Sequence, residues 1–157
     1  MIEMLVLKRI LLAALLGGII GFERERAHKV AGLRTHVLVC VSATLLTLMA
    51  IYGFDQSTPD SISRIIANVI LGVGFIGGGA IVRQETHIMG TTTAATLWTV
   101  AAIGLSIGVG FTFAAVLVTL LGYLTLTILW RIEVKMSGKN HQDEIQVANQ
   151  DEHRASH

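Results

Sequence analysis

Three long runs without a charged residue constrain this chain more than any other feature. They cover residues 37–54, 65–82 and 88–130. A helix needs about 20 apolar residues to cross the hydrocarbon core of a bilayer, which is roughly 30 Å thick. The last run is long enough for two crossings. It divides near Gly108 and Gly110, because glycine lowers helix propensity.

A fourth apolar run, residues 10–22, is shorter. It reaches crossing length only if Lys8 and Arg9 lie within the helix and snorkel towards water. The chain is 52 % hydrophobic and holds sixteen glycines, which are more frequent in membrane helices than in soluble ones. The predicted fold is therefore all-α, a polytopic integral membrane helical bundle with five transmembrane helices at about 4–22, 35–54, 64–82, 91–109 and 111–130.

The charges between these runs predict the orientation. Four of the twelve Lys and Arg residues lie in the first connection, whereas the second connection, residues 55–63, has none. The third connection begins with Arg83. Because positive charge accumulates in cytoplasmic loops, we expect the first and third connections inside and the N-terminus outside. Residues 1–130 then form one transmembrane domain, and residues 131–157 form a polar cytoplasmic tail that we expect to be disordered.

Glycines at four-residue spacing indicate where the helices pack. Helices in lipid approach each other closely where both carry small residues. Five glycines fall within residues 72–79, and two interpretations of that run remain open: a tightly packed helix, or an unwound segment lining a polar cavity. The predicted packing positions are Gly17, Gly21, Gly74, Gly77, Gly78, Gly104 and Gly108.

Two motifs of soluble enzymes occur in the sequence, and both lack their structural context. Residues 72–77 match GxGxxG, but no βαβ unit surrounds them. Residues 104–108 match the GxSxG elbow, but the nearest plausible bases, His36 and His87, belong to the opposite membrane face. At 1.5 Å per residue they lie roughly 20 Å from Ser106. With a single Cys40 and no histidine spacing typical of a metal site, we expect no enzyme activity, cofactor or metal.

Polar residues converge on the predicted inner face. Thr35 and Thr91 are placed to cap the helices that follow them, and two helix N-termini beside Arg34 and Arg83 would attract an anion. Alternatively, these charges only set the topology and bind lipid headgroups. The candidate functional residues, the inner-face cluster, are Glu23, Arg24, Glu25, Arg26, Lys29, Arg34, Thr35, His36, Arg83 and Thr91.

Four segments in order carry a family resemblance. They read LGGIIGFERE with AGLRTH (residues 16–25 and 31–36), GVGFIGGGAI (72–81), GTTTAATLW (90–98) and AAIG (101–104). The chain resembles the short form of the MgtC/SapB family, whose longer members add a soluble C-terminal domain. The resemblance implies a bacterial inner-membrane protein, associated with growth at low magnesium and, in pathogens, with virulence. It implies action on other membrane proteins, the proton-translocating ATP synthase among them.

Two functions are compatible with these features. The first is a small regulator of other membrane proteins, with self-association left open. The second is a transporter or channel for magnesium or another ion, which would need oxygen ligands, above all carboxylates, at membrane depth. No Asp or Glu falls within the five predicted crossings, and Asn68 is the one amide there. This pattern favours the regulator.

Overall fold

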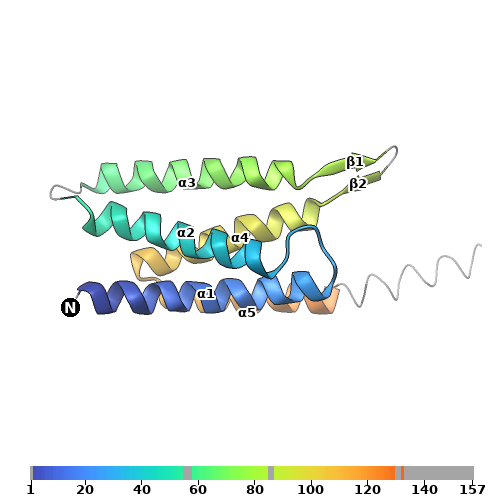
Figure 1. The fold of residues 1–157 in the computed structure, drawn as a ribbon, viewed down its shortest axis with the longest axis horizontal. Coiled ribbons are helices and arrows are strands. Elements are labelled where there is room, and N and C mark those ends of the chain that lie inside the picture. Colours follow the sequence, from blue (N-terminus) through green and yellow to red (C-terminus); the bar gives the residue numbers. More distant parts are fainter. Residues whose placement is uncertain (1, 55–57, 85–86, 130–131, 133–157) are drawn as a thin grey trace, which may run out of the picture. The chain divides into compact units, whose positions relative to one another are not determined.

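The computed structural model describes residues 2–54, 58–84, 87–129 and 132 (Figure 1). Most of the predicted polar tail lies outside these residues. The chain forms two compact units, Met1–Tyr123 and Leu124–His157, and the first four helices pack together within the first unit. In order, the elements are α1 (Ile2–Arg26), α2 (Leu33–Tyr52), α3 (Pro59–Gly79), β1 (Val82–Gln84), β2 (His87–Met89), α4 (Thr91–Val109), α5 (Thr112–Leu124) and a π-helical turn, η1 (Thr125–Leu129).

Five helical segments of the described chain are long and apolar enough to cross a bilayer. Their lengths are 25 residues for α1, 20 for α2, 21 for α3, 19 for α4 and 18 for α5 with η1. These lengths match the thickness of the hydrocarbon core. The predicted fold of a polytopic helical membrane protein with five crossings is confirmed.

The helix ends differ from the predicted ones where local hydrogen bonds decide them. The predicted first crossing ends at residue 22, but α1 continues to Arg26, since charged residues do not break a helix. The third was predicted to begin at residue 64, but α3 begins at Pro59. There the Thr58 hydroxyl accepts from the Ser61 amide at 3.2 Å and the Ser61 hydroxyl accepts from the Thr58 amide at 2.9 Å. This reciprocal pair is a capping box, which starts the helix.

A small β-hairpin joins α3 to α4, and the all-α prediction did not include it. Strands β1 and β2 pair antiparallel with Arg83 opposite Ile88. The predicted third crossing extended to residue 82, whereas α3 ends at Gly79. Gly90 then enters α4 with φ 90°, and a Cβ there would collide with the Ala80 carbonyl oxygen. A residue without a side chain is therefore needed to bring the start of α4 against the end of α3.

Close glycine contacts hold α1, α2 and α4 together. A Cβ on Gly17 would lie 2.7 Å from Cys40 Cβ, and one on Gly21 would lie 2.9 Å from His36 Cβ, so α1 and α2 touch backbone to side chain. On α4, a Cβ on Gly104 would collide with the carbonyl of Cys40, and one on Gly108 with Thr47. These four glycines of the predicted packing set therefore lie at close helix contacts, and the three helices form the core.

Helix α3 lies on the far side of α2 and α4 from α1 (Figure 1). It buries only Val73 and Gly77. A Cβ on Gly77 would lie 3.5 Å from the Ala94 carbonyl oxygen, which is an ordinary contact. Nothing lies within 4 Å of a Cβ built on Gly74 or Gly78, so the prediction that these two glycines pack was wrong within this chain. The alternative of an unwound segment was also wrong, because α3 is continuously helical through residues 72–79.

The snorkelling predicted for the first crossing takes a specific form. Arg9 lies in the membrane-length part of α1, and its Nη1 donates to the Gly108 carbonyl at 2.8 Å. That carbonyl is at the C-terminal end of α4, where a helix carries partial negative charge and unsatisfied acceptors. Arg9 therefore ties the start of α1 to the end of α4.

Candidate functional site

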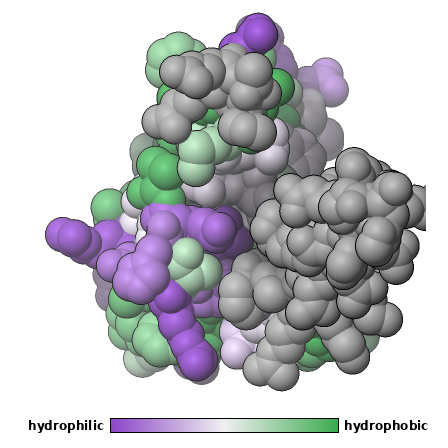
Figure 2. Space-filling view, turned by 90° about the vertical axis from the view of Figure 1, so that its right-hand side faces the viewer, coloured by the Kyte–Doolittle hydropathy of each residue, from purple (hydrophilic) through white to green (hydrophobic). Residues whose placement is uncertain are grey.

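The residues of the predicted inner-face cluster lie towards one end of the first unit, which we call the charged end. It consists of the end of α1 (residues 23–26), the start of α2 (32–36), the β-hairpin and the start of α4 (90–96). Contacts between Gly21 and His36 and between Gly90 and Ala80 bring these segments together. Figure 2 looks onto this end, where hydrophilic residues form one continuous area at the lower left of the view and others stand at its top.

A buried ion pair lies at the end of α1. Arg24 is 3 % exposed, and its Nη1 lies 3.6 Å from Oε2 of Glu23, whose side chain is 13 % exposed. Glu23 Oε2 and Arg24 Nε have no hydrogen-bond partner among the described residues. Buried polar atoms are nearly always paired, so an acceptor and a donor left open side by side indicate a position for a further polar group.

The other acidic residue here caps a neighbouring helix. The amide of Leu33 donates to Glu25 Oε2 at 3.0 Å, so a carboxylate from α1 sits at the N-terminus of α2. A Cβ on Gly32 would collide with that carboxylate, which explains the glycine. The predicted cap by Thr35 was wrong, because α2 begins at Leu33 with Gly32 as its N-cap. An anion site at this N-terminus is also contradicted, since the chain supplies its own carboxylate there.

The start of α4 likewise differs from the prediction. Gly90 is its N-cap, without a side-chain cap, so the predicted capping by Thr91 was wrong. Thr91 is exposed in the first turn. The capping hydroxyl was expected one position after the glycine. Because Gly90 itself adopts the cap position, Thr91 instead becomes the first helical residue.

A buried polar chain links α2 to α4 just inside the charged end. His36 is fully buried, its Nδ1 donates to the Gly32 carbonyl at 2.8 Å, and its Nε2 lies 3.0 Å from Thr96 Oγ1. The Thr96 hydroxyl also donates to the Thr93 carbonyl at 2.9 Å. His36 was predicted as a site residue, but Thr96 was missed. Its spacing of three from Thr93 on a helix was the available signal, because such residues share a face.

The basic members of the inner-face cluster other than Arg24 lie on the surface. Arg26, Lys29, Arg34 and Arg83 are all exposed. Arg34 was predicted to lie beside an anion-attracting helix N-terminus, yet the buried guanidinium belongs to Arg24. Among the described residues, no three His, Cys, Asp or Glu side chains come together as metal ligands.

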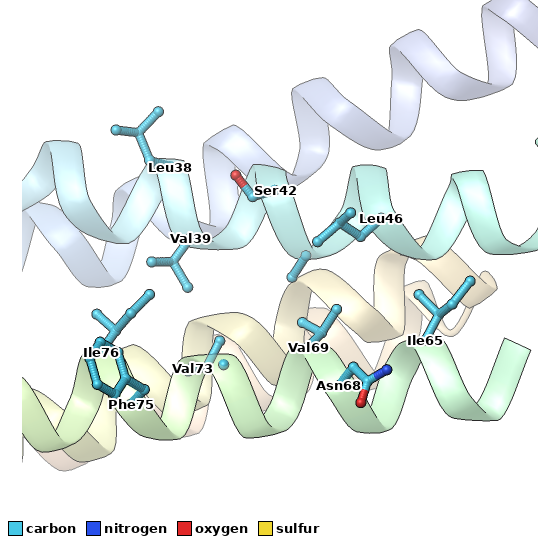
Figure 3. Close-up of a pocket in the computed structure, with 12 residues that line it drawn as sticks. Leu38, Val39, Ser42, Leu46, Ile65, Asn68, Val69, Val73, Phe75 and Ile76 are labelled. Carbon is cyan, nitrogen blue, oxygen red and sulfur yellow. The ribbon is translucent and has the colours of Figure 1, made fainter.

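The intramembrane amide lies apart from this end. Asn68 is exposed on α3 and lines a groove of about 730 Å³ between α2 and α3 (Figure 3). The other residues that line the groove are apolar or glycine, except for Ser42.

Comparison with known proteins agrees with the family resemblance. The chain is 38 % identical over 146 residues to YhiD of Escherichia coli K12, a protein named as a candidate magnesium transporter, covering 90 % of this chain and 68 % of YhiD. It is 41 % identical over 107 residues to the MgtC protein of Brucella abortus strain 2308, covering 68 % of this chain and 44 % of that protein. No solved structure matches it.

A third relative is the MgtC protein of Salmonella typhimurium strain LT2, 43 % identical over 101 residues, which are 64 % of this chain and 42 % of that protein. The chain thus spans less than half the length of the MgtC proteins that it matches. Residues 10–135, which include all of the packed helices except the start of α1, match the MgtC family. This chain is a multi-pass membrane protein of the MgtC family.

Proposed function

We propose that this chain is a small regulator of other membrane proteins in adaptation to low magnesium, and not itself an ion carrier. The observation that carries the proposal is the pairing of Glu23 with Arg24. Among the acidic residues of the described helices, Glu23 is the one whose side chain is mostly buried. Arg24, whose Nη1 is 3.6 Å away, already supplies its counter-charge. A magnesium site needs several oxygen ligands free of competing cations.

The packing of the core supports the same proposal. Glycine contacts close the space between α1, α2 and α4. The buried hydroxyls there are engaged by carbonyl oxygens: Thr44 reaches those of Cys40 and Gly104 at 3.0 and 2.9 Å, and Thr47 reaches that of Ala43 at 2.8 Å. Hydroxyls held in this way contribute to helix packing, and are poorly placed to exchange ligands with a moving ion.

Magnesium transport is the alternative, and the name of the related YhiD favours it. Two measurements separate the functions. The chain is expressed in a bacterium that lacks its own MgtC-family genes and is tested for growth at low magnesium. It is also reconstituted in liposomes that contain a magnesium-sensitive dye. A regulator restores growth and leaves the rate of dye response at that of empty liposomes. A rate that rises with the amount of protein contradicts the proposal.

Arginine-to-lysine exchanges test the site. Lysine preserves the charge but lacks the planar fork of donors. We expect Arg24→Lys to reduce growth at low magnesium while abundance in the membrane stays normal, because Arg24 is buried beside Glu23. Arg26→Lys is the matched control, since Arg26 lies on the same helix and is exposed. Arg34→Lys should also be silent. Equal growth with all three variants would count against a specific site.

The orientation and the partner belong to the same proposal. We place the protein in the bacterial inner membrane with the charged end in the cytoplasm, the N-terminus outside and the C-terminal tail inside, by the positive-inside rule. Alkaline phosphatase fused after Gly53 should be active, and after Lys29 inactive.

Photo-crosslinking from the exposed Arg34 and Arg83 positions tests the partner, for which the family resemblance suggests the ATP synthase.

A further inference from the structure

The groove between α2 and α3 covers only part of the membrane thickness. On α3, the residues that line it begin at Ile65 and end at Ile76. These eleven helical steps rise about 16 Å, which is close to half of the roughly 30 Å hydrocarbon core. Figure 3 shows Ile65 and Asn68 near one end of the groove, and Phe75 and Ile76 near the other. The groove therefore has about the depth of one leaflet.

A cation and an amide stand at the shallow end of this groove. Arg64 directly precedes the charge-free run 65–82, and Asn68 follows one helical turn later; both are exposed. Within the described parts of the chain, Arg64 forms no ion pair, not even with Asp60 one turn before it, and Asn68 forms no hydrogen bond. One turn rises 5.4 Å. The amide thus lies about that far below the arginine, where the hydrocarbon begins.

This order of groups matches that of a phospholipid. From water inward, a phospholipid presents an anionic phosphate, then ester oxygens, then acyl chains, and the headgroup region adds roughly 5–7 Å on each side of the hydrocarbon. Arginine binds phosphate through its planar fork of donors, and an amide N–H donates to an oxygen acceptor. We propose that one phospholipid binds here, with its phosphate on Arg64, an ester oxygen on Asn68 and one acyl chain in the groove.

The dimensions favour an acyl chain over a neighbouring helix. A transmembrane helix spans the whole hydrocarbon core and presents its side chains along all of it, whereas this groove ends after about half. An acyl chain has the length of one leaflet, and its phosphate brings an anion to the depth of Arg64. The site lies at the start of α3, whereas the hairpin of the charged end follows the end of α3 (Figure 1). In the proposed orientation it faces the outer leaflet.

A bound lipid would complete the packing of α3. This helix buries only Val73 and Gly77 against its own chain. An acyl chain in the groove contacts α2 and α3 together, so it joins two helices that otherwise share little buried surface. Because a ligand that binds only the folded state raises its stability, added phospholipid should raise the unfolding temperature, and the rise with lipid concentration gives the apparent affinity.

Filling the groove tests the place of the acyl chain. The purified protein is unfolded by heat in a phosphate-free detergent with increasing dioleoyl phosphatidylglycerol. Gly72 lines the groove and Gly74 does not, yet a Cβ on either meets nothing within 4 Å, so Gly72→Leu and Gly74→Leu are matched variants that both fold. We expect Gly72→Leu to weaken the apparent affinity at least tenfold and Gly74→Leu to leave it unchanged. Equal affinity of the two variants overturns the proposal.

Removing the phosphate tests the role of Arg64. Dioleoylglycerol has the same acyl chains and ester groups but no phosphate. The wild type should bind the phospholipid about tenfold more tightly, which is the size of one hydrogen bond to a charged group. Arg64→Gln should abolish that preference, whereas Arg83→Gln, at an exposed arginine of the hairpin, should keep it. Asn68→Ala should weaken the binding of both lipids. Equal binding of the two lipids by the wild type, or equal effects of the two arginine variants, shows only unspecific lipid contact and overturns the site.

Discussion

The core of α1, α2 and α4 and the peripheral helix α3 carry the same glycine spacing and use it differently. In the core, Gly17 and Gly104 are pressed against Cys40 from both sides of α2. On α3, Gly74 and Gly78 have the same spacing but no atom within 4 Å of a Cβ. A pair of small residues therefore predicts a face suited to close approach. It does not tell whether the same chain or another molecule covers that face.

The two regions also differ in how they treat polar groups. The core satisfies its hydroxyls on carbonyls and holds His36 between Gly32 and Thr96. Helix α3 leaves Asn68 exposed on its surface, one turn after Arg64. The core is therefore closed, whereas α3 presents small and polar positions on its surface.

The greatest loss of stability should come from a change in the core. Gly104→Ala places a methyl group against the Cys40 carbonyl, where neither backbone can retreat without separating α2 from α4. Overpacking of this kind costs about 1–3 kcal/mol and occasionally more. We expect a strongly lowered unfolding temperature in detergent and reduced membrane abundance. If the Gly104→Ala variant is as stable as the wild type, the core is looser than these contacts indicate.

A smaller effect should follow from the polar link between α2 and α4. Thr96→Val keeps the shape of the side chain but leaves His36 Nε2 buried without a partner, which costs about 1–3 kcal/mol. Thr99→Val is the control on the same helix, since the Thr99 hydroxyl bonds only to its own helix at Ala95. Thermal unfolding of the two variants should differ. If both variants unfold at the same temperature as the wild type, the hydrogen bond between His36 and Thr96 contributes nothing to stability.

Within α3, two neighbouring glycines should respond differently to the same substitution. Gly77→Leu must displace Ala94, whose carbonyl oxygen is 3.5 Å from a Cβ, so we expect about 1 kcal/mol of destabilisation. Gly78→Leu meets open space and should leave the isolated chain as stable as the wild type. Unfolding of monomers in detergent measures both. A larger loss for Gly78→Leu would place α3 in a different rotation.

The least change in stability is expected for Gly74→Ala. Its added methyl group touches nothing within 4 Å, and alanine is favoured over glycine in helix interiors by about 0.5–1 kcal/mol. Stability in detergent should therefore stay level or rise slightly. A clear loss would mean that this flank of α3 is covered within the single chain.

Much of the fold was predictable, because the thickness of the bilayer sets the length of apolar sequence that a crossing helix needs. Apolar segments of crossing length located all five helices, and α4 matches its predicted bounds of 91–109. The hairpin between α3 and α4 was not predictable from hydropathy, since strands of three residues leave no periodic signal. The capping of α2 was also missed, because its cap, Glu25, comes from a different helix.

The candidate site was only partly predictable. The charge pattern placed these residues at one end, but Arg34 and Arg24 look alike in a sequence, as arginines between apolar runs. Only the structure shows Arg24 to be buried beside Glu23 and Arg34 to be exposed. Thr96 was missed because its partner His36 is sixty residues away in the chain.

The class of protein, the number of crossings and the family resemblance follow from the sequence alone. Each of these depends on local properties, namely charge-free length and residue order, that exist before any helix meets another. Tertiary packing settles which arginine is buried, which glycines touch a neighbour and where Asn68 is left without a partner. These are properties of the rotation of each helix against its neighbours. In lipid that rotation follows from close packing and hydrogen bonds between segments distant in sequence, because burial of apolar surface no longer distinguishes one face from another.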